Sequence, residues 1–515
     1  MGALAGLMAA FTALAVAELA AGLVRPSSGP VTVVGGAVID RTPAVVKDFA
    51  IRTFGENDKI VLQLGILVVL ALIATVLGIL ALPHRLAGVA GVLLFGIVGA
   101  LAALGRPDSA GLGDALPSIA GAAAGALALH ILVGRASAVP HADGAHEPGG
   151  EGMRSRRGFL LAAGATGFAA TSAGLLGRYF ARQDGESAVA SRESLVLPKP
   201  ASPAPAVPAG VQLKVPGISA FTTPNPAFYR VDTALAVPKV SVATWRLRIH
   251  GKGVARPRTY TLDQLLARPL IERDITLTCV SNEVGGPYIG NARWLGVPLA
   301  GLLAESGVRP PSKGGRADQL VARSVDGMTL GSPVEDVMDG RDAILAVGMN
   351  GEPLPFDHGF PVRMLVPGLY GYVSACKWIE DIELTTFDAY DPYWVKRKWA
   401  RRAPIKTQAR IDTPAPFARL AAGTVAIAGV AWAQHRGISR VQVRVDDGPW
   451  WDADLAATAG IDTWRQWSYR WNATPGGHTI TVRATDGTGQ VQTEERARTI
   501  PDGASGWHSV FVTVP

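Results

Sequence analysis

The chain has 515 residues, a formal net charge of +7 and 48% hydrophobic residues. This length predicts more than one domain, because single hydrophobic cores seldom grow beyond about 250–300 residues. The two cysteines exclude a disulfide scaffold and a four-cysteine metal site from this chain alone, and no CxxCH motif attaches a c-type haem. The charge is modest and no basic stripe carries interleaved aromatics, which argues against a nucleic-acid partner.

The apolar excess lies in the first third, where four segments are long enough to cross a membrane. A span needs about 20 apolar residues, because a rise of about 1.5 Å per residue must cover a hydrocarbon core of about 30 Å. A fifth run, rich in Ala and Gly, follows them and is less hydrophobic. The five predicted spans are Ala3–Val24, Ile60–Leu82, Leu86–Leu104, Ala115–Val133 and Gly158–Leu176.

The stretch Ser155–Leu160 (SRRGFL) precedes the fifth span and resembles a twin-arginine export signal. Its arginines also fit ordinary positive-inside anchors, and both interpretations can hold together. Either one places this loop and the N-terminus in the cytoplasm and everything after about residue 180 outside. Because twin-arginine export carries folded proteins, it predicts a cofactor loaded before crossing. His84 and His130, near span ends, are interpreted as helix-packing or interfacial residues in preference to haem ligands.

Three further regions follow the membrane domain of residues 1–180. Residues 181–217 are rich in Pro and Ala and predict an extended linker. In residues 218–403, strands at 243–250 and 275–279 are interspersed with helices at 261–268 and 294–307, which predicts an α+β domain. Residues 404–515 alternate in strand fashion between turn signals, which predicts an immunoglobulin-like β-sandwich.

Cys279 ends the predicted strand ITLTC and raises the question of its role. From the residues alone, half of a disulfide, an inert core thiol and a functional thiol are equally favoured. As a nucleophile it lacks a recognisable neighbouring base. A metal ligand fits better if a cofactor supplies the other ligands, because the chain has few soft ligands of its own.

Several stretches across residues 218–515 carry a more specific pattern. They are FTTPNPAFYR, LTCVSNE, ARWLGVPLAGLL, AVGMNGEPLPFDHGFPVRMLVPGLYGYVSACKWI and WHSVFVTV. Together, in this order and spacing, they resemble the sulfite oxidase family of molybdopterin enzymes. The resemblance implies a molybdenum–molybdopterin cofactor bound to the α+β domain. It also implies an immunoglobulin-like C-terminal domain of the kind that mediates dimers.

In that family the metal is held by the pterin dithiolene and one cysteine thiolate, and Cys279 matches that ligand. Cys376 falls where the family has a small apolar residue, so we interpret it as core, which disfavours a disulfide. Buried phosphates need Arg, Lys or His donors, which agrees with the matched set. The positions that match cofactor-binding residues are Asn225, Phe228, Tyr229, Arg230, Ser324, His358, Arg363, Ser374 and Lys377.

The match departs from sulfite oxidases at the substrate side. Their Arg–Asn–His group corresponds to residues 231–233 here, which include Asp232, and their Arg pair after the ligand cysteine corresponds to 282–284, which include Glu283. Trp399 replaces a tyrosine. Sulfite is a dianion and needs cations, so these exchanges disfavour it and favour a neutral S- or N-oxide. The predicted catalytic residues are Cys279, Asp232, Glu283 and Trp399, with either carboxylate a proton donor or, alternatively, a solvated loop group.

The sequence therefore predicts a membrane-anchored molybdopterin oxidoreductase that transfers oxygen atoms outside the cytoplasmic membrane. Since the haem domain of some relatives is missing from the chain, electrons are expected to pass to or from a separate cytochrome or quinone. A homodimer through the C-terminal domain is a further expectation. Two alternatives stay open: a membrane-tethered, non-catalytic binding or scaffold relative, and a sulfoxide reductase of the protein-repair type.

Overall fold

The computed structural model describes residues 1–43, 46, 53–54, 58–106, 109, 111–137, 151–234 and 236–515. They form two compact units. Met1–Ser187 make up nearly all of the first, and the second holds almost everything from Ala188 to Pro515. Residues 44–45, 47–52 and 55–57 of the predicted loop between the first two spans lie outside the described residues.

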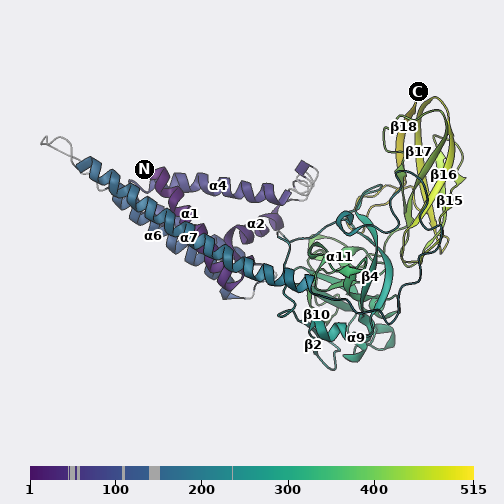
Figure 1. The fold of residues 1–515 in the computed structure, drawn as a ribbon, viewed down its shortest axis with the longest axis horizontal. Helices are drawn as coiled ribbons and strands as arrows, with labels where there is room; N and C mark the ends of the chain where they lie inside the picture. The colour runs from purple at the N-terminus through teal and green to yellow at the C-terminus, as the bar shows by residue number, and fades with distance from the viewer. Residues whose placement is uncertain are drawn as a thin grey trace. The chain divides into compact units, whose positions relative to one another are not determined.

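The first unit is helical, as the sequence predicted (Figure 1). Five helical stretches are long and apolar enough to cross a membrane: Gly2–Val24, Ile60–Leu80, Arg85–Leu104, Leu112–Ala136 and Arg157–Glu193. Each overlaps one of the five predicted spans. The helices are α1 (Gly2–Val24), α2 (Pro30–Arg41), α4 (Asp58–Leu80), α5 (Arg85–Leu104), α6 (Leu116–Ser137) and α7 (Glu151–Glu193), with 3₁₀ turns η1 (Pro26–Ser28) and η3 (Leu112–Ala115).

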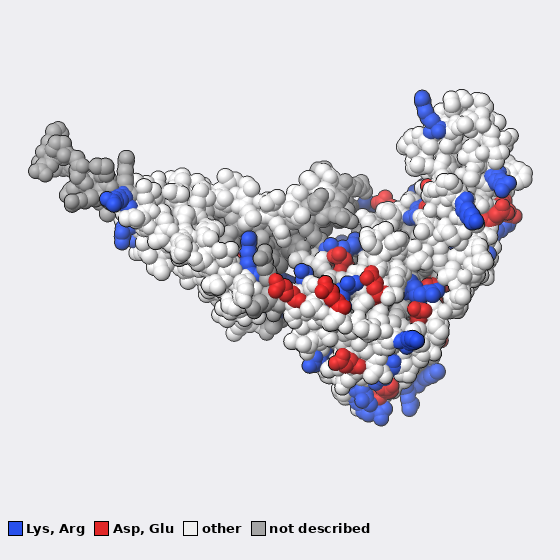
Figure 2. Space-filling model, viewed as in Figure 1, with Lys and Arg blue, Asp and Glu red and all other residues white. Residues whose placement is uncertain are grey.

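The helices of this unit pack through small residues and turn apolar side chains outward. A Cβ at Gly6 of α1 would lie 1.9 Å from the Ala74 carbonyl oxygen of α4, so only glycine allows this approach. Leu64, Val68 and Leu72 of α4 are each more than half exposed. The visible surface of this unit is almost free of charge between its ends (Figure 2). Close packing through small residues and an apolar outer surface are typical of helix bundles that contact lipid.

Two features of the connecting segments were not predicted. The 12-residue helix α2 lies in the presumed loop after the first span and is too short to cross a bilayer. Helix α7 continues to Glu193, so the first part of the predicted linker 181–217 is helical. The rest is extended and packs on the second unit, where Ala201 N donates to Leu270 O at 2.8 Å.

The middle domain of the second unit is α+β, built on two five-stranded sheets, in agreement with the prediction. The first has the order β2-β1-β10-β5-β6, and the second has β3-β4-β7-β8 with β9 pairing to β7. The strands are β1 (Leu247–Gly251), β2 (Arg258–Tyr260), β3 (Ile271–Thr278), β4 (Ile289–Pro298), β5 (Gln319–Ser324), β6 (Thr329–Pro333), β7 (Ile344–Met349), β8 (Glu352–Pro353), β9 (Arg363–Leu365) and β10 (Ile379–Thr385). The helices are α8 (Leu262–Leu266), α9 (Leu299–Glu305), α10 (Val334–Met338) and α11 (Gly371–Ser374), with 3₁₀ turns η4 (Asn225–Ala227), η5 (Pro311–Lys313), η6 (Phe356–His358) and η7 (Val395–Arg397).

A local signal accounts for one of these helices, and a second was predicted with the wrong start. Thr261 and Gln264 form a capping box that starts α8, because each side chain accepts from the other residue's backbone N–H. The predicted helix 294–307 was wrong in its first half. Residues up to Pro298 belong to β4, where the buried Trp294 pairs with Met349 of β7, and α9 begins only at Leu299.

The C-terminal domain is a sandwich of two four-stranded antiparallel sheets, β11-β12-β16-β15 and β14-β13-β17-β18. Alternate residues of two paired strands in the second sheet, Val441, Val443, Ile480 and Val482, fill the core together with Trp467 of the first sheet. The strands are β11 (Gln408–Thr413), β12 (Gly423–Trp432), β13 (Ile438–Val445), β14 (Trp451–Asp452), β15 (Asp454–Leu455), β16 (Arg465–Ala473), β17 (Gly476–Asp486) and β18 (His508–Val514).

Candidate molybdenum-cofactor site

Cys279 directly follows β3 and opens a tight loop. Its N–H donates to Tyr288 O at 3.0 Å, and its carbonyl accepts from Asn282 N at 3.0 Å. The Ser281 N–H donates to the Cys279 sulfur at 3.4 Å. Burial raises the pKa of this thiol, against a lowering by Ser281 and by the positive charge of Lys377. The thiol would therefore become a thiolate only when a metal or another cation binds it.

Cys376 has a different environment. Both cysteines are free and buried in the structure, so no disulfide joins them. Cys376 is fully enclosed in the main apolar core, and this burial raises its pKa far above the usual range. Its interpretation as a core residue agrees with this position.

Arg363 starts β9 and is a buried cation without an acidic partner among the described residues. Its Nη1 donates weakly to His358 O at 3.4 Å, and its Nε has no hydrogen-bond partner within the described part of the chain. The guanidinium lies over the Trp294 ring at 5.4 Å. Burial lowers its pKa to about 10. Because a buried unpaired guanidinium is costly, the geometry fits a site that takes an anion.

Lys377 follows α11 and is the second buried cation. Its Nζ donates to Asp232 Oδ2 at 2.8 Å and to Asp357 O at 3.2 Å. Burial lowers the pKa of Lys377 to about 8, although the Asp232 carboxylate opposes this. Arg230 donates from Nε to the same Asp232 oxygen at 2.8 Å and pairs through Nη1 with Asp357 at 3.1 Å. Asp232 is thus a buried carboxylate held between two cations, with 3% of its side chain exposed.

The aromatic residues of segment 225–230 cover one side of this cluster. Phe228 stacks on Tyr229 at 5.2 Å and meets the His358 ring edge-on at 5.5 Å. A Cβ at Gly290 would lie 2.8 Å from Phe228, so glycine allows this ring to lie on β4. Tyr229 is partly buried, and its pKa rises because of burial and the neighbouring Cys279 thiol. His358 Nε2 donates to Asn225 O at 3.1 Å, and burial lowers its pKa to about 4.

The structure thus brings together six of the predicted residues: Cys279, Tyr229, Arg230, His358, Arg363 and Lys377, with Phe228 and Asp232 beside them. The other five have different surroundings. The side-chain amide of Asn225 bonds to Met349 O, Glu352 and Asn350, which fixes the loop below His358.

The two predicted serines make internal hydrogen bonds. Ser374 Oγ donates to Leu369 O at 2.9 Å and Tyr370 O at 3.1 Å, within its own turn. Ser324 Oγ accepts from Asp326 N at 3.5 Å. Glu283 is exposed on the loop after Cys279. Trp399 packs with Tyr372 at 5.5 Å and Trp394 at 6.1 Å, and no contact joins it to the cluster among the described residues.

Sequence reasoning missed the support of β3 by the C-terminal domain. Gln434, after β12, is fully buried and donates from Nε2 to Thr276 O at 3.0 Å and Thr278 Oγ1 at 2.9 Å. Trp464 N donates to Thr276 Oγ1 at 2.8 Å, and Thr276 N donates to Asp462 O at 2.9 Å. We call Gln434, Asp462 and Trp464 the sandwich clamp. A buried Gln in an apolar stretch, AWAQHRG, was the available signal.

Comparison with known proteins agrees with this geometry. Residues 234–394 match the family described as "Oxidoreductase molybdopterin binding domain", and residues 408–482 match "Bacterial Ig domain". The fold and the site thus define a molybdopterin-binding oxidoreductase joined to an immunoglobulin-like domain. By these matches the chain is similar to the sulfite oxidase-like molybdopterin oxidoreductases, whose cofactor is molybdenum held by molybdopterin.

Three relatives indicate the range of this family. Mitochondrial sulfite oxidase of Mus musculus is 30% identical over 291 residues, which cover 48% of this chain and 53% of the relative. Nitrate reductase [NADH] of Solanum lycopersicum is 35% identical over 198 residues, covering 34% and 21%. The crystal structure of the sulfane dehydrogenase SoxCD from Paracoccus pantotrophus aligns with a TM-score of 0.50 and 25% identity, over 57% of this chain and 82% of that one. The chain spans about half the length of the mouse relative.

The residues present fit the cofactor. The thiol of Cys279 is buried and needs a cation to ionise, as a metal ligand does. The Nε of Arg363 has no hydrogen-bond partner among the described residues. The positive charge of Arg363 also lowers the pKa of Lys377, so the two cations act on each other. The site thus offers one soft sulfur ligand for the metal, Cys279, and two buried cations for a phosphate, Arg363 and Lys377.

Proposed function

We propose that the protein is a membrane-anchored molybdopterin oxidoreductase whose catalytic domain lies outside the cytoplasmic membrane and acts on a substrate other than sulfite. When bound, the cofactor supplies two-electron exchange coupled to oxygen-atom transfer. Cys279 would hold the metal. Arg363, Lys377 and His358 would hold the phosphate and pterin, and Phe228 and Tyr229 would exclude water from the pterin face.

One observation carries the substrate proposal. Lys377 is the cation that acts electrostatically on the Cys279 thiol, and its charge is already paired with Asp232 at 2.8 Å. Arg230 is likewise shared between Asp232 and Asp357. A dianion would meet cations whose charge is largely balanced, and a cofactor phosphate would compete for the same groups. A neutral S- or N-oxide needs no such cation.

The surroundings of Asp232 disfavour the role of proton donor that its sequence position suggested. A carboxylate held between two cations is a poor source of a proton, because both neighbours favour its ionised form. We propose that Asp232 positions Lys377 and Arg230 and lowers the positive charge that an arriving substrate meets. Glu283, exposed on the loop after the ligand, stays the candidate for proton transfer.

The anchoring and the redox partner belong to the same proposal. Five apolar helices and the twin-arginine-like stretch support a multi-pass membrane protein with its second unit exported. We propose a separate cytochrome or quinone as the electron-transfer partner and a homodimer through the C-terminal domain.

Metal analysis tests the enzyme proposal. The full chain, expressed in a host that makes the cofactor, should carry about one molybdenum per chain by mass spectrometry. Cys279→Ser should lose it, whereas the matched variant Cys376→Ser should retain it. Absence of molybdenum from the wild-type protein would favour the binding or scaffold alternative and overturn the enzyme.

Substrate screening tests the second part. Neutral sulfoxides and N-oxides should be turned over with a viologen donor, and sulfite with an artificial acceptor should not. Sulfite turnover at rates ordinary for this enzyme class, about 1–10³ s⁻¹, would show that the charge argument is wrong. Turnover of protein-bound methionine sulfoxide in preference to small sulfoxides would select the protein-repair alternative.

A further inference from the structure

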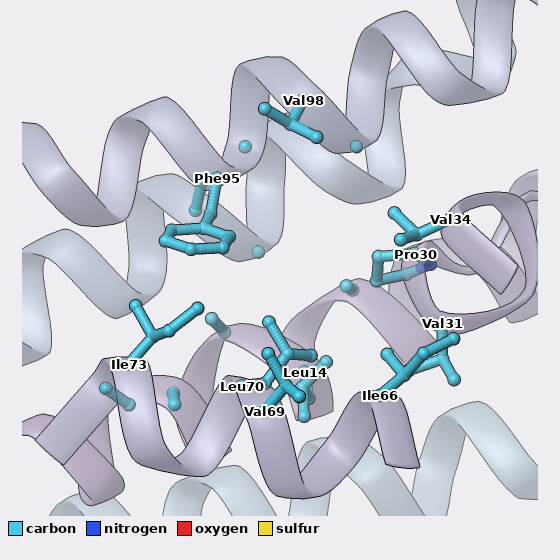
Figure 3. Close-up of a pocket in the computed structure, with 18 of the residues that line it drawn as sticks. Leu14, Pro30, Val31, Val34, Ile66, Val69, Leu70, Ile73, Phe95 and Val98 are labelled. Atoms are coloured by element: carbon cyan, nitrogen blue, oxygen red, sulfur yellow. The ribbon is translucent and has the colours of Figure 1, made fainter. Parts of the chain in front are cut away.

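The first unit has a partly open apolar cavity of about 670 Å³ between α1, α2, α4, α5 and α6. This volume falls in the range of small-molecule sites, about 300–1,000 Å³. Figure 3 shows Phe95 and Val98 of α5 across the cavity from Ile66, Val69 and other apolar side chains of α4. Among the described residues that line it, none is titratable and Ser118 is the one with a polar side chain.

Ser118 is the one described residue of this unit whose buried hydroxyl lacks a hydrogen-bond partner. Its side chain is 4% exposed, and its Oγ has no hydrogen-bond partner among the described residues. The hydroxyl lies against α5, where a Cβ at Gly99 would come within 2.7 Å of it. An unpaired buried hydroxyl costs free energy, and a carbonyl oxygen in the cavity would satisfy it.

The cavity extends along α4. Its α4 lining follows helical spacing from Val61 to Leu77, which corresponds to a length of about 24 Å at 1.5 Å per residue. Ser118 lies one helical turn after Asp114, which pairs with Arg25 at 3.0 Å and marks a charged rim of the bundle. The carbonyl acceptor is therefore expected near the boundary between headgroups and hydrocarbon.

We infer that this cavity is a binding site for an acyl chain of a membrane phospholipid, whose ester carbonyl accepts a hydrogen bond from Ser118. The inference rests on the proposed membrane location. The long apolar stripe fits a chain, and the single hydroxyl at the charged end fits an ester. A redox-active quinone that exchanges protons would need a titratable group beside its carbonyl, and no described lining residue supplies one.

Photocrosslinking on the full chain in nanodiscs tests the site. A phosphatidylcholine that carries a diazirine in one acyl chain should label lining residues of α4 and α5 above the level of the outward-facing positions of α4. Gly65→Leu should abolish that labelling, because Gly65 lines the cavity and a Cβ there meets nothing within 4 Å. Gly36→Leu, on α2, is the matched control, since its Cβ also has open space but lies outside the lining.

Ser118→Ala should reduce labelling about fivefold, which corresponds to one lost hydrogen bond of about 1 kcal/mol, and Ser118→Thr should restore it. Equal labelling of the lining in wild type and Gly65→Leu would overturn the site. Displacement of the lipid by a short-chain quinone would overturn its assignment to a phospholipid. Molybdenum content should be unchanged in all four variants, so failure here is separate from failure of the proposed enzyme.

Discussion

Arg363 is buried, lies over the Trp294 ring and has an Nε without a hydrogen-bond partner among the described residues, so its charge is expected to destabilise the cofactor-free protein. Arg363→Met should raise the free energy of unfolding of the apo form by about 1–3 kcal/mol, because it removes an uncompensated buried cation. The same change should abolish molybdenum retention, measured beside thermal unfolding.

A matched arginine provides the control. Arg341 is also largely buried but pairs with Asp336 at 3.0 Å and Asp339 at 2.6 Å. Arg341→Met should therefore destabilise the protein and leave molybdenum bound. If both variants lowered apo stability equally, Arg363 would have a partner that accounts for its burial.

Two buried histidines should make the stability of the cofactor-free second unit fall at acid pH. Burial lowers the pKa of His358 and of His508 to about 4, below the ordinary value of 6.5. His508 Nδ1 accepts from Ile411 N at 3.0 Å, so its protonation breaks that bond. Each neutral ring contributes stability that is complete above pH 6.5 and is lost as the pH falls toward 4, up to about 3 kcal/mol per site.

Denaturant titrations at several pH values check this. His358→Gln and His508→Gln should each flatten the stability–pH curve between pH 4 and 6.5, and the double variant should flatten it further. An unchanged slope in either single variant would show that its ring is protonated in the folded state.

At the scale of elements, β3 is held from outside its own domain by the sandwich clamp. Gln434→Ala removes two buried hydrogen bonds and leaves Thr276 O and Thr278 Oγ1 without that donor, a cost of about 2 kcal/mol or more. Because Thr278 directly precedes Cys279, the proposed metal ligand, the variant should also lose molybdenum from folded protein.

Gln442→Ala is the control for this effect. Gln442 makes a similar set of bonds, to Asp452 and Arg483, on the sheet face of β13 that turns away from the core. It should retain molybdenum per folded chain. Equal molybdenum content in the two variants would show that the sandwich clamp contributes to stability and not to cofactor binding.

The same elements show what sequence could predict. The capping box of α8, the alternation of β13 and β17 and the apolar runs of the first unit are local signals, and each gave the observed element. The helix predicted at 294–307 failed in its first half because pairing with β7 outweighs local preference. Matched motifs predicted the cluster around Cys279. The clamp depends on residues far apart in sequence, which no local pattern relates.

At the scale of the whole molecule, export is the property to test. Arg156→Lys combined with Arg157→Lys should leave the second unit in the cytoplasm, because twin-arginine signals do not tolerate the loss of both guanidinium groups. A protease added to cells that have lost their outer envelope but keep an intact cytoplasmic membrane should then fail to cleave the second unit. Unaffected cleavage would overturn the twin-arginine assignment.

The control exchanges arginines at the ends of other apolar helices. Arg85→Lys with Arg135→Lys keeps the same positive charge and the same type of change, at the start of α5 and in the last turn of α6. Export should be normal in this variant, which separates a signal from a general topological effect.

The sandwich clamp also imposes an order on biosynthesis. A ribosome releases the apolar helices first, then Cys279, and only long afterwards Gln434 and Trp464. The strand before Cys279 is therefore braced only after translation has passed Trp464. Under the proposed export route, the first four spans would already be in the bilayer while the pocket is still unfinished and facing the cytoplasm. Maturation then has two stages, insertion during synthesis and cofactor loading after it, and the fifth span crosses only in the second.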